Sequence, residues 1–243
     1  MDYSMQGLGF EHGDVVVVTG AASGIGRATA KTAARAGLTV WGWDIMGGQL
    51  SAVVEEIKRD GGDAVATVCD VRDPDAVARA WDEAGRIGSP RYLVNNAGPA
   101  SNTELTYQEG LDQATGSMVL VTEQWLSRFG EVAEATTFTS SIAAEQGGWN
   151  WYSVAKAAIK AYTRTIARLH GGKPRANAVA PGLIITPRTL SFGSEMIESM
   201  AKRVPMGRNG QPEEVATEIC FLLSPAASFI NGVYLPVDGG ALL

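Results

Sequence analysis

The feature that most constrains the fold is a run of four valines, Val15–Val18, followed at once by a glycine-rich turn. A continuous β-branched run predicts a strand that is buried on both faces, as parallel sheets require. A helical pattern over 24–36 follows the turn and stops at Gly37. A buried strand that leads directly into a helix predicts an α/β protein.

The same alternation of strand and helix continues to the end of the chain, and no repeat, linker or low-complexity segment divides it. It predicts a doubly wound parallel sheet in one domain over 1–243. Further strands are expected at 38–43, 64–69, 92–94, 135–140, 175–179 and 233–237, and further helices near 48–60, from Asp73-Pro74 onward, and near 107–128, 152–169 and 212–223.

Composition excludes several functional classes. The net charge of −6, without a basic run, argues against nucleic acid. Residues 1–13 lack the apolar core of a signal peptide and no stretch approaches a membrane span, so we expect a cytoplasmic protein without membrane contact. Cys69 and Cys220 do not make a disulfide framework. His12 and His170 lie far apart without ligand-like neighbours, so no metal site is expected.

Tyr152 and Lys156 lie four residues apart in an alanine-rich stretch that favours a helix. That spacing places the phenol and the ammonium on one helix face, about one turn apart. A nearby cation favours the phenolate, so we expect the pKa of Tyr152 to fall from about 10 towards the range that acid–base catalysis needs. Taken alone, the pair is equally typical of an exposed helix surface.

The glycine-rich turn Thr19-Gly20-Ala21-Ala22-Ser23-Gly24-Ile25-Gly26 joins the first predicted strand to the first helix. Glycines at such a turn let the backbone approach a pyrophosphate, whose charge rests on helix N–H groups. The glycines alone are also compatible with an ordinary tight turn. Their spacing, T-G-x-x-x-G-x-G, differs from the general G-x-G-x-x-G dinucleotide fingerprint.

Other motifs follow in order: Asn95-Asn96-Ala97-Gly98, Ser140-Ser141, Tyr152 with Lys156, Asn177-Ala178-Val179-Ala180-Pro181-Gly182 and Val237-Asp238-Gly239-Gly240. With the glycine turn, this set strongly resembles the short-chain dehydrogenase/reductase family over nearly the whole chain. The resemblance implies a Rossmann-type, three-layer αβα domain with about seven strands. It also implies an oxidoreductase that interconverts a secondary alcohol and a ketone with a nicotinamide cofactor, as a homotetramer or homodimer packed through the helices near 107–128 and 152–169.

The resemblance also implies a set of cofactor-binding residues. They are Gly20, Ser23, Gly24, Ile25 and Gly26 at the phosphate and nicotinamide end, Asp70 and Val71 at the adenine, Asn96 through its backbone, Pro181, Gly182, Ile184 and Thr186 at the carboxamide, and Lys156, beside Tyr152, at the nicotinamide ribose.

Asp44 bears on the choice of cofactor. It closes the second predicted strand about 20 residues after the glycine turn, where a carboxylate accepts hydrogen bonds from the ribose hydroxyls. A carboxylate there repels a 2′-phosphate, and the neighbouring Ala21, Ala22, Ile45 and Met46 supply no cation. We therefore expect NAD and disfavour NADP. The alternative is that Asp44 only caps the following helix.

In the expected reaction Tyr152 exchanges a proton with the substrate oxygen, Lys156 supports the phenolate, and a serine hydroxyl bonds the same oxygen. The resemblance favours Ser141 as that serine. Ser140 is the reserve, because the loop 142–151 looks shorter than in relatives.

The substrate pocket is expected to involve Trp149, although a core or subunit contact would suit that ring equally. The segment 187–205 matches the variable substrate loop of the family. Arg188 within it either holds a carboxylate or is solvated, and we favour solvation. An apolar lid is suggested by Leu190, Phe192, Met196, Ile197 and Met200.

Ala114 departs from the family pattern, since many relatives carry an asparagine at this position, where it is thought to kink the helix and hold a water through its main chain. Gly116 could supply the irregular turn instead, so we expect an active enzyme whose proton exchange is slower or differently routed. The alternative function is a low-turnover protein of the same fold that binds or senses NAD.

Overall fold

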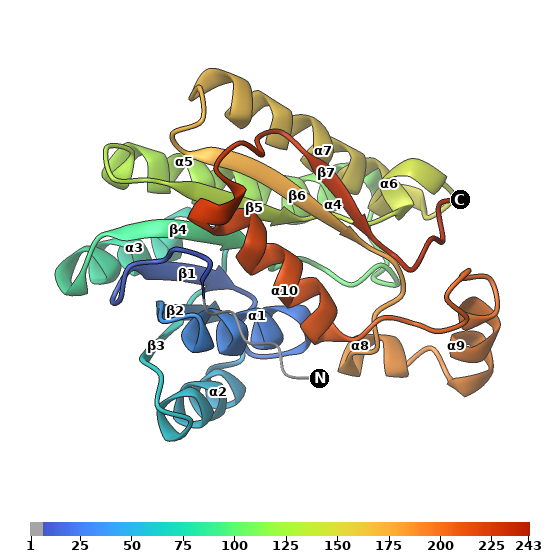
Figure 1. Cartoon of the computed structure of the whole chain (residues 1–243). Coiled ribbons are helices and arrows are strands. Elements are labelled where there is room, and N and C mark those ends of the chain that lie inside the picture. The colour runs from blue at the N-terminus through green and yellow to red at the C-terminus, as the bar shows by residue number, and fades with distance from the viewer. Residues whose placement is uncertain (1–6) are drawn as a thin grey trace.

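A seven-stranded parallel sheet forms the centre of the computed structural model, which describes residues 7–243 (Figure 1). The strand order β3-β2-β1-β4-β5-β6-β7 is that of a Rossmann-type fold, as predicted. The strands are β1 Val15–Thr19, β2 Thr39–Asp44, β3 Ala64–Val68, β4 Pro90–Asn95, β5 Ala135–Thr139, β6 Arg175–Pro181 and β7 Tyr234–Val237.

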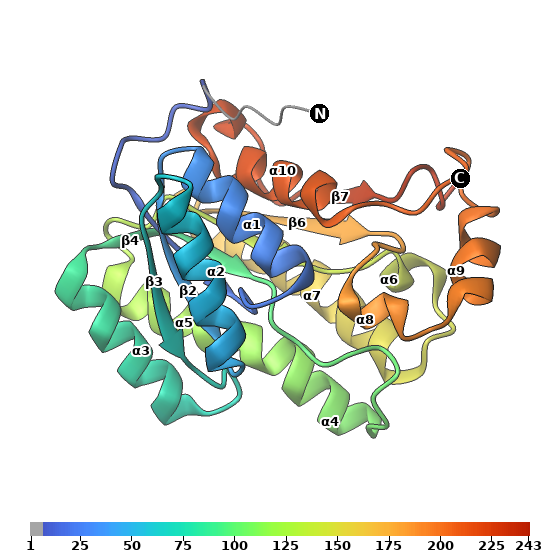
Figure 2. The same cartoon turned by 90° about the horizontal axis from the view of Figure 1, so that it is seen from below.

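Helices cover both faces of the sheet and complete three layers (Figures 1 and 2). Those labelled α1, α2 and α10 lie on one face, and α3, α5 and α7 lie on the other. The helices are α1 Gly24–Arg35, α2 Gly47–Arg59, α3 Pro74–Ile87, α4 Tyr107–Leu111, α5 Ser117–Phe129, α6 Ala143–Gln146, α7 Asn150–Leu169, α8 Pro187–Leu190, α9 Ser194–Ala201 and α10 Pro212–Leu223.

Local sequence signals account for the first elements. The valine run is the body of β1, and its side chains are at most 7% exposed, as a strand covered on both faces requires. Asp73 accepts a hydrogen bond from the N–H of Asp75 at 2.9 Å and caps α3, which begins at Pro74. The buried strand and the start of a helix at Asp73-Pro74 were predicted from the sequence.

The helix predicted over 107–128 is interrupted. Between α4 and α5 lies a π-helical turn, Asp112–Gly116, in which the N–H of Ser117 bonds to the carbonyl of Asp112, five residues back. Such a turn widens the helix by one residue and is frequent at functional sites. The irregular turn expected near Gly116 is therefore present without an asparagine.

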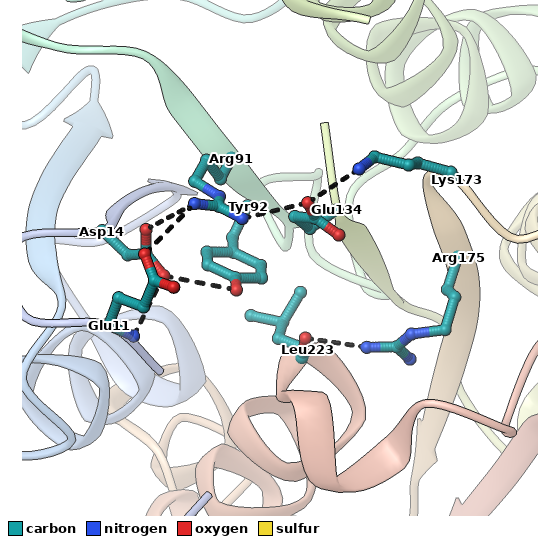
Figure 3. A network of polar contacts seen from close by, with 8 residues as sticks. All are labelled: Glu11, Asp14, Arg91, Tyr92, Glu134, Lys173, Arg175 and Leu223. Atoms are coloured by element: carbon teal, nitrogen blue, oxygen red, sulfur yellow. Dashed lines mark hydrogen bonds and ion pairs between the residues drawn. The ribbon is translucent and has the colours of Figure 1, made fainter. Parts of the chain in front are cut away.

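A polar network holds the edge of the sheet where the strands begin (Figure 3). Arg91 pairs with Asp14 at 3.4 Å and with Glu134 at 3.0 Å. Arg175, which is 7% exposed, donates to the carbonyl of Leu223 at the C-terminal end of α10, so a cation satisfies that helix end.

Along residues 7–243, no helix combines the length and apolar character needed to cross a membrane. Within the same described range, no group of three or more His, Cys, Asp or Glu side chains is arranged to hold a metal ion.

Candidate active site

A cavity of about 440 Å³ opens at the carboxyl ends of the strands. In open α/β sheets this edge, near the point where the strand order reverses, is where ligands bind. Of the predicted site residues, only Gly26 and Ala114 lie outside its walls. The predicted residues that line it are Gly20, Ser23, Gly24, Ile25, Asp44, Asp70, Val71, Asn96, Ser140, Ser141, Trp149, Tyr152, Lys156, Pro181, Gly182, Ile184 and Thr186.

The glycine turn brings the start of α1 against the end of β1. Gly20 has φ +70°, and a Cβ there would lie 2.9 Å from Asn96 Nδ2. A Cβ on Gly26 would lie 1.9 Å from the carbonyl oxygen of Gly20, so only glycine allows this approach. Gly26 therefore packs the helix onto the turn and does not line the cavity, and its predicted contact with the cofactor stays a prediction.

The N-terminus of α1 is suited to an anion. Its first turn holds no acidic residue, and the N-cap residue Ser23 forms no capping hydrogen bond through its side chain. The first N–H groups of the helix, which have no partner within it, are therefore free to bind a phosphate. Together with the close backbone approach, this cradle fits the pyrophosphate of a dinucleotide.

Thr19 ties this turn to the end of β4. Its Oγ1 accepts hydrogen bonds from the N–H groups of Asn96, at 2.9 Å, and Ala97, at 3.1 Å. The side-chain amide of Asn96 donates back to the Thr19 carbonyl at 3.1 Å. The backbone after β4 is thereby held against the glycine turn, where the sequence predicted that Asn96 would meet the cofactor.

Asp44 is 8% exposed and lines the cavity at the end of β2. Its Oδ2 accepts from the N–H of Ala22 at 3.0 Å and its Oδ1 from the N–H of Met46 at 3.0 Å. The carboxylate thus joins the glycine turn to the residue that precedes α2. Since a carboxylate has about four acceptor positions, it can also accept bonds from a ligand.

Lys156 lies on α7, lines the cavity and is 6% exposed. Its Nζ donates to the Thr139 carbonyl at 2.8 Å and lies 5.4 Å from the centroid of the Tyr152 ring. Burial, with a smaller contribution from the charge of Arg188, lowers the pKa of Lys156 from 10.5 to about 7. The predicted one-turn pairing with Tyr152 is therefore present.

The pKa of Tyr152 does not fall as predicted. Burial raises it, and this effect outweighs the opposing ones of the Arg188 charge and of the hydrogen bond with Ser141. The expectation was wrong, because sequence spacing shows a neighbouring cation but not the loss of water around the phenol.

The two serines have different partners. Ser140 is 2% exposed and donates its hydroxyl to the Lys156 carbonyl at 2.8 Å. The Ser141 side chain instead hydrogen-bonds with Tyr152 and accepts from the N–H of Ala143 at 3.2 Å. Tyr234 of β7 donates its hydroxyl to the Ser141 carbonyl, a contact that the sequence did not indicate.

The wall of the cavity is partly apolar. Trp149, which is 38% exposed, lines it, as do Phe192 and Met200 from the predicted lid. Leu190, Met196 and Ile197 of the predicted lid do not line the cavity, and Leu190 and Met196 are 58% and 49% exposed. This segment forms two short helices, α8 and α9.

Arg188 also lines the cavity. Its Nη2 donates to the Gly98 carbonyl at 3.0 Å, in the loop that follows β4. The sequence favoured a merely solvated side chain and missed this contact, because Arg188 and Gly98 are 90 residues apart in the chain.

Ala114 lies in the π-helical turn, is 1% exposed and packs with Trp151 and Ala155 of α7. Its neighbour Gln113 does line the cavity and accepts a hydrogen bond from Arg72 at 3.4 Å. The position that departs from the family pattern is thus a packing site behind Tyr152.

Comparison with known proteins agrees with this geometry. A family model described as enoyl-(acyl carrier protein) reductase matches residues 20–241. The chain is 37% identical to the cis-4-hydroxycyclohexanecarboxylate dehydrogenase of Sinomonas cyclohexanicum, over 93% of this chain and 95% of that protein. It is 33% identical to the 3-oxoacyl-[acyl-carrier-protein] reductase of Thermotoga maritima, over 95% of this chain and 98% of that protein.

A solved 7α-hydroxysteroid dehydrogenase, in complex with NADH and 7-oxoglycochenodeoxycholic acid, superposes with a TM-score of 0.88 at 30% identity and covers 99% of this chain and 97% of its own. The fold, the cavity and these full-length similarities lead to one conclusion. The chain belongs to the short-chain dehydrogenase/reductase family and is an NAD(P)-dependent oxidoreductase that acts on CH–OH groups.

Proposed function

We propose that the protein is an NAD-dependent dehydrogenase that interconverts a secondary alcohol and a ketone, with Tyr152 as the general acid and base. One observation carries this proposal. A single cavity brings Asp44 and the glycine turn at one end together with Ser141, Tyr152 and Lys156 at the other.

The role of each side chain in the proposed reaction follows from its contacts. The Ser141 hydroxyl, paired with Tyr152, is placed to bond the same substrate oxygen, and it stabilises negative charge there. Tyr152 takes the alcohol proton in oxidation and returns it in reduction. Ser140 has a structural role, since its hydroxyl is committed to the backbone of α7. When bound, a nicotinamide cofactor supplies the hydride acceptor or donor.

Lys156 assists Tyr152 electrostatically. Burial lowers the pKa of its amine to about 7, so near neutral pH the amine is only partly charged. Any negative group that enters the cavity favours the ammonium form, which in turn favours the phenolate of Tyr152. The backbone carbonyl of Thr139 keeps the amine in place throughout.

Asp44 favours the binding of NAD over that of NADP. Its buried carboxylate, already bonded to two N–H groups, is held rigidly beside the adenine end. A 2′-phosphate placed there would meet that charge without a compensating cation from Ile45 or Met46, which follow it. The solved 7α-hydroxysteroid dehydrogenase, which was determined with NADH, supports the same choice.

The substrates of the relatives suggest a medium-sized, largely apolar carbon skeleton, in keeping with Trp149, Phe192 and Met200 in the wall of the cavity. The test is to follow NADH formation with a panel containing cis-4-hydroxycyclohexanecarboxylate, meso-2,3-butanediol and a 7α-hydroxy bile acid. Tyr152→Phe should lower turnover by on the order of 100-fold or more while the Kd for NADH stays within about threefold. Tight NADH binding without turnover of any alcohol or ketone would favour a binding or sensing protein instead.

A further inference from the structure

The reaction end of the cavity is positively charged. Of its lining residues, only Asp44 and Asp70 are acidic, and they follow β2 and β3. Tyr152 and Lys156 lie beside the end of β5, three and four strands away, on the order of 14–19 Å. The two basic side chains at that end, Lys156 and Arg188, therefore face no carboxylate of the cavity wall.

Arg188 is the cation that a substrate can reach. It lies on α8, whose start is fixed because Thr186 and Thr189 cap it reciprocally. Its guanidinium donates to the Gly98 carbonyl and forms no ion pair with any residue in the range 7–243. Since a guanidinium has five N–H donors in a planar fork, most of its hydrogen-bonding capacity remains available on the cavity side.

The charge of Arg188 acts at the reaction centre. After burial, it is the largest influence on the pKa of both Tyr152 and Lys156, and it lowers each. Trp149 and Phe192 add apolar walls to the same cavity. A ligand that places its hydroxyl or keto group at Tyr152 therefore lies in a cavity that offers it both apolar walls and a guanidinium.

We propose that Arg188 binds a carboxylate carried by the substrate, so that the enzyme prefers hydroxy acids and oxo acids to neutral alcohols and ketones. The inference rests on the proposed function and deepens it. A planar carboxylate matches the guanidinium fork with two parallel hydrogen bonds, which gives orientation as well as attraction. The competing ligand is the cofactor pyrophosphate, because Thr186 lies against the glycine turn, 3.2 Å from where a Cβ of Gly24 would be.

The test uses two ketones that differ in one charge, 4-oxocyclohexanecarboxylate and its methyl ester, both reduced with NADH. Arg188→Met removes the cation and keeps most of the aliphatic stem, whereas Arg188→Lys keeps the charge without the fork. Arg203→Met is the matched control, since Arg203 is an exposed arginine of the same segment that lies outside the cavity. The ratio of kcat/KM for the acid to that for the ester cancels any common effect on Tyr152.

We expect the unmodified enzyme to favour the acid, and Arg188→Met to lower this ratio at least about tenfold, mainly through KM for the acid. The ratio for Arg188→Lys should lie between those of the unmodified enzyme and of Arg188→Met, and Arg203→Met should leave the ratio unchanged. A ratio near one in the unmodified enzyme, or one that Arg188→Met leaves unchanged, would overturn the proposal. A loss of NADH affinity in Arg188→Met with an unchanged ratio would assign Arg188 to the pyrophosphate.

A binding measurement separates this inference from the function on which it rests. Calorimetric titration of the NADH complex with cyclohexanecarboxylate should show binding that Arg188→Met weakens about tenfold. If neither ketone is reduced but this dependence is found, the proposed reaction fails and the carboxylate site stands. If the unmodified NADH complex does not bind cyclohexanecarboxylate, the carboxylate site is refuted.

Discussion

Replacement of Asp44 by alanine should affect both stability and cofactor choice. The carboxylate accepts hydrogen bonds from two backbone N–H groups, and in the proposed function it also accepts them from the ribose hydroxyls of NAD. In the structure Oδ2 accepts a hydrogen bond from the N–H of Ala22, a residue that is 4% exposed. Oδ1 accepts one from the N–H of Met46, a residue that is 38% exposed. In the alanine variant, water can take the place of the carboxylate at Met46 but not readily at the buried Ala22. Leaving one buried N–H unpaired costs about 1–3 kcal/mol.

We therefore expect Asp44→Ala to lower the free energy of unfolding by about 1–3 kcal/mol in the absence of cofactor, measured by urea denaturation. In the same variant the Kd for NAD, measured by calorimetry, should rise at least about tenfold, or about 1.4 kcal/mol. The Kd for NADP should change much less, because the lost carboxylate also removes a repulsion. The unmodified protein should bind NAD at least about tenfold more tightly than NADP.

A matched control lies at the other edge of the sheet. Asn231 accepts the N–H of Ala176, which is 0% exposed, at 2.9 Å, so Asn231→Ala should destabilise the protein similarly without changing the preference between NAD and NADP. Equal affinities of the unmodified protein for NAD and NADP would refute the role of Asp44 in cofactor choice. An unchanged free energy of unfolding in Asp44→Ala would refute its role in holding the turn.

Four other variants test the reaction end of the cavity and the packing behind it. The pKa of Lys156 is about 7 in the folded protein and near 10.5 in the unfolded chain, so between these pH values the unfolded chain binds more protons. The free energy of unfolding without cofactor should therefore rise with pH in this range, by up to about 1.4 kcal/mol per pH unit. Urea titrations of Lys156→Met should lack this rise, and an identical pH profile would contradict the burial argument. Ser141→Ala should lower turnover about tenfold or more, whereas Ser140→Ala should mainly cost about 1 kcal/mol of stability, and the reverse result would exchange their roles. Ala114→Asn should cost about 1–3 kcal/mol in urea denaturation, because it buries an amide against Trp151, and should leave the Kd for NAD within about threefold. A large gain in turnover in that variant would show that the missing asparagine limits the natural protein.

Residues that lie close together in the sequence determined several structural features of this protein by themselves. The valine run fixes β1 because consecutive β-branched residues favour a strand buried on both faces. The glycines of the first turn predict a close backbone approach, and the spacing of Tyr152 and Lys156 predicts one helix face. These features could be predicted because they depend on residues a few positions apart.

Tertiary structure decided what depends on burial and on distant segments. Ser140 and Ser141 are adjacent and chemically identical, and only their partners on α7 separate them. Tyr234 reaches Ser141 across 93 residues of chain, and Arg188 reaches Gly98 across 90. The direction of the Tyr152 pKa shift likewise required the packed cavity, because desolvation is produced by every element around the phenol and by no short stretch of sequence.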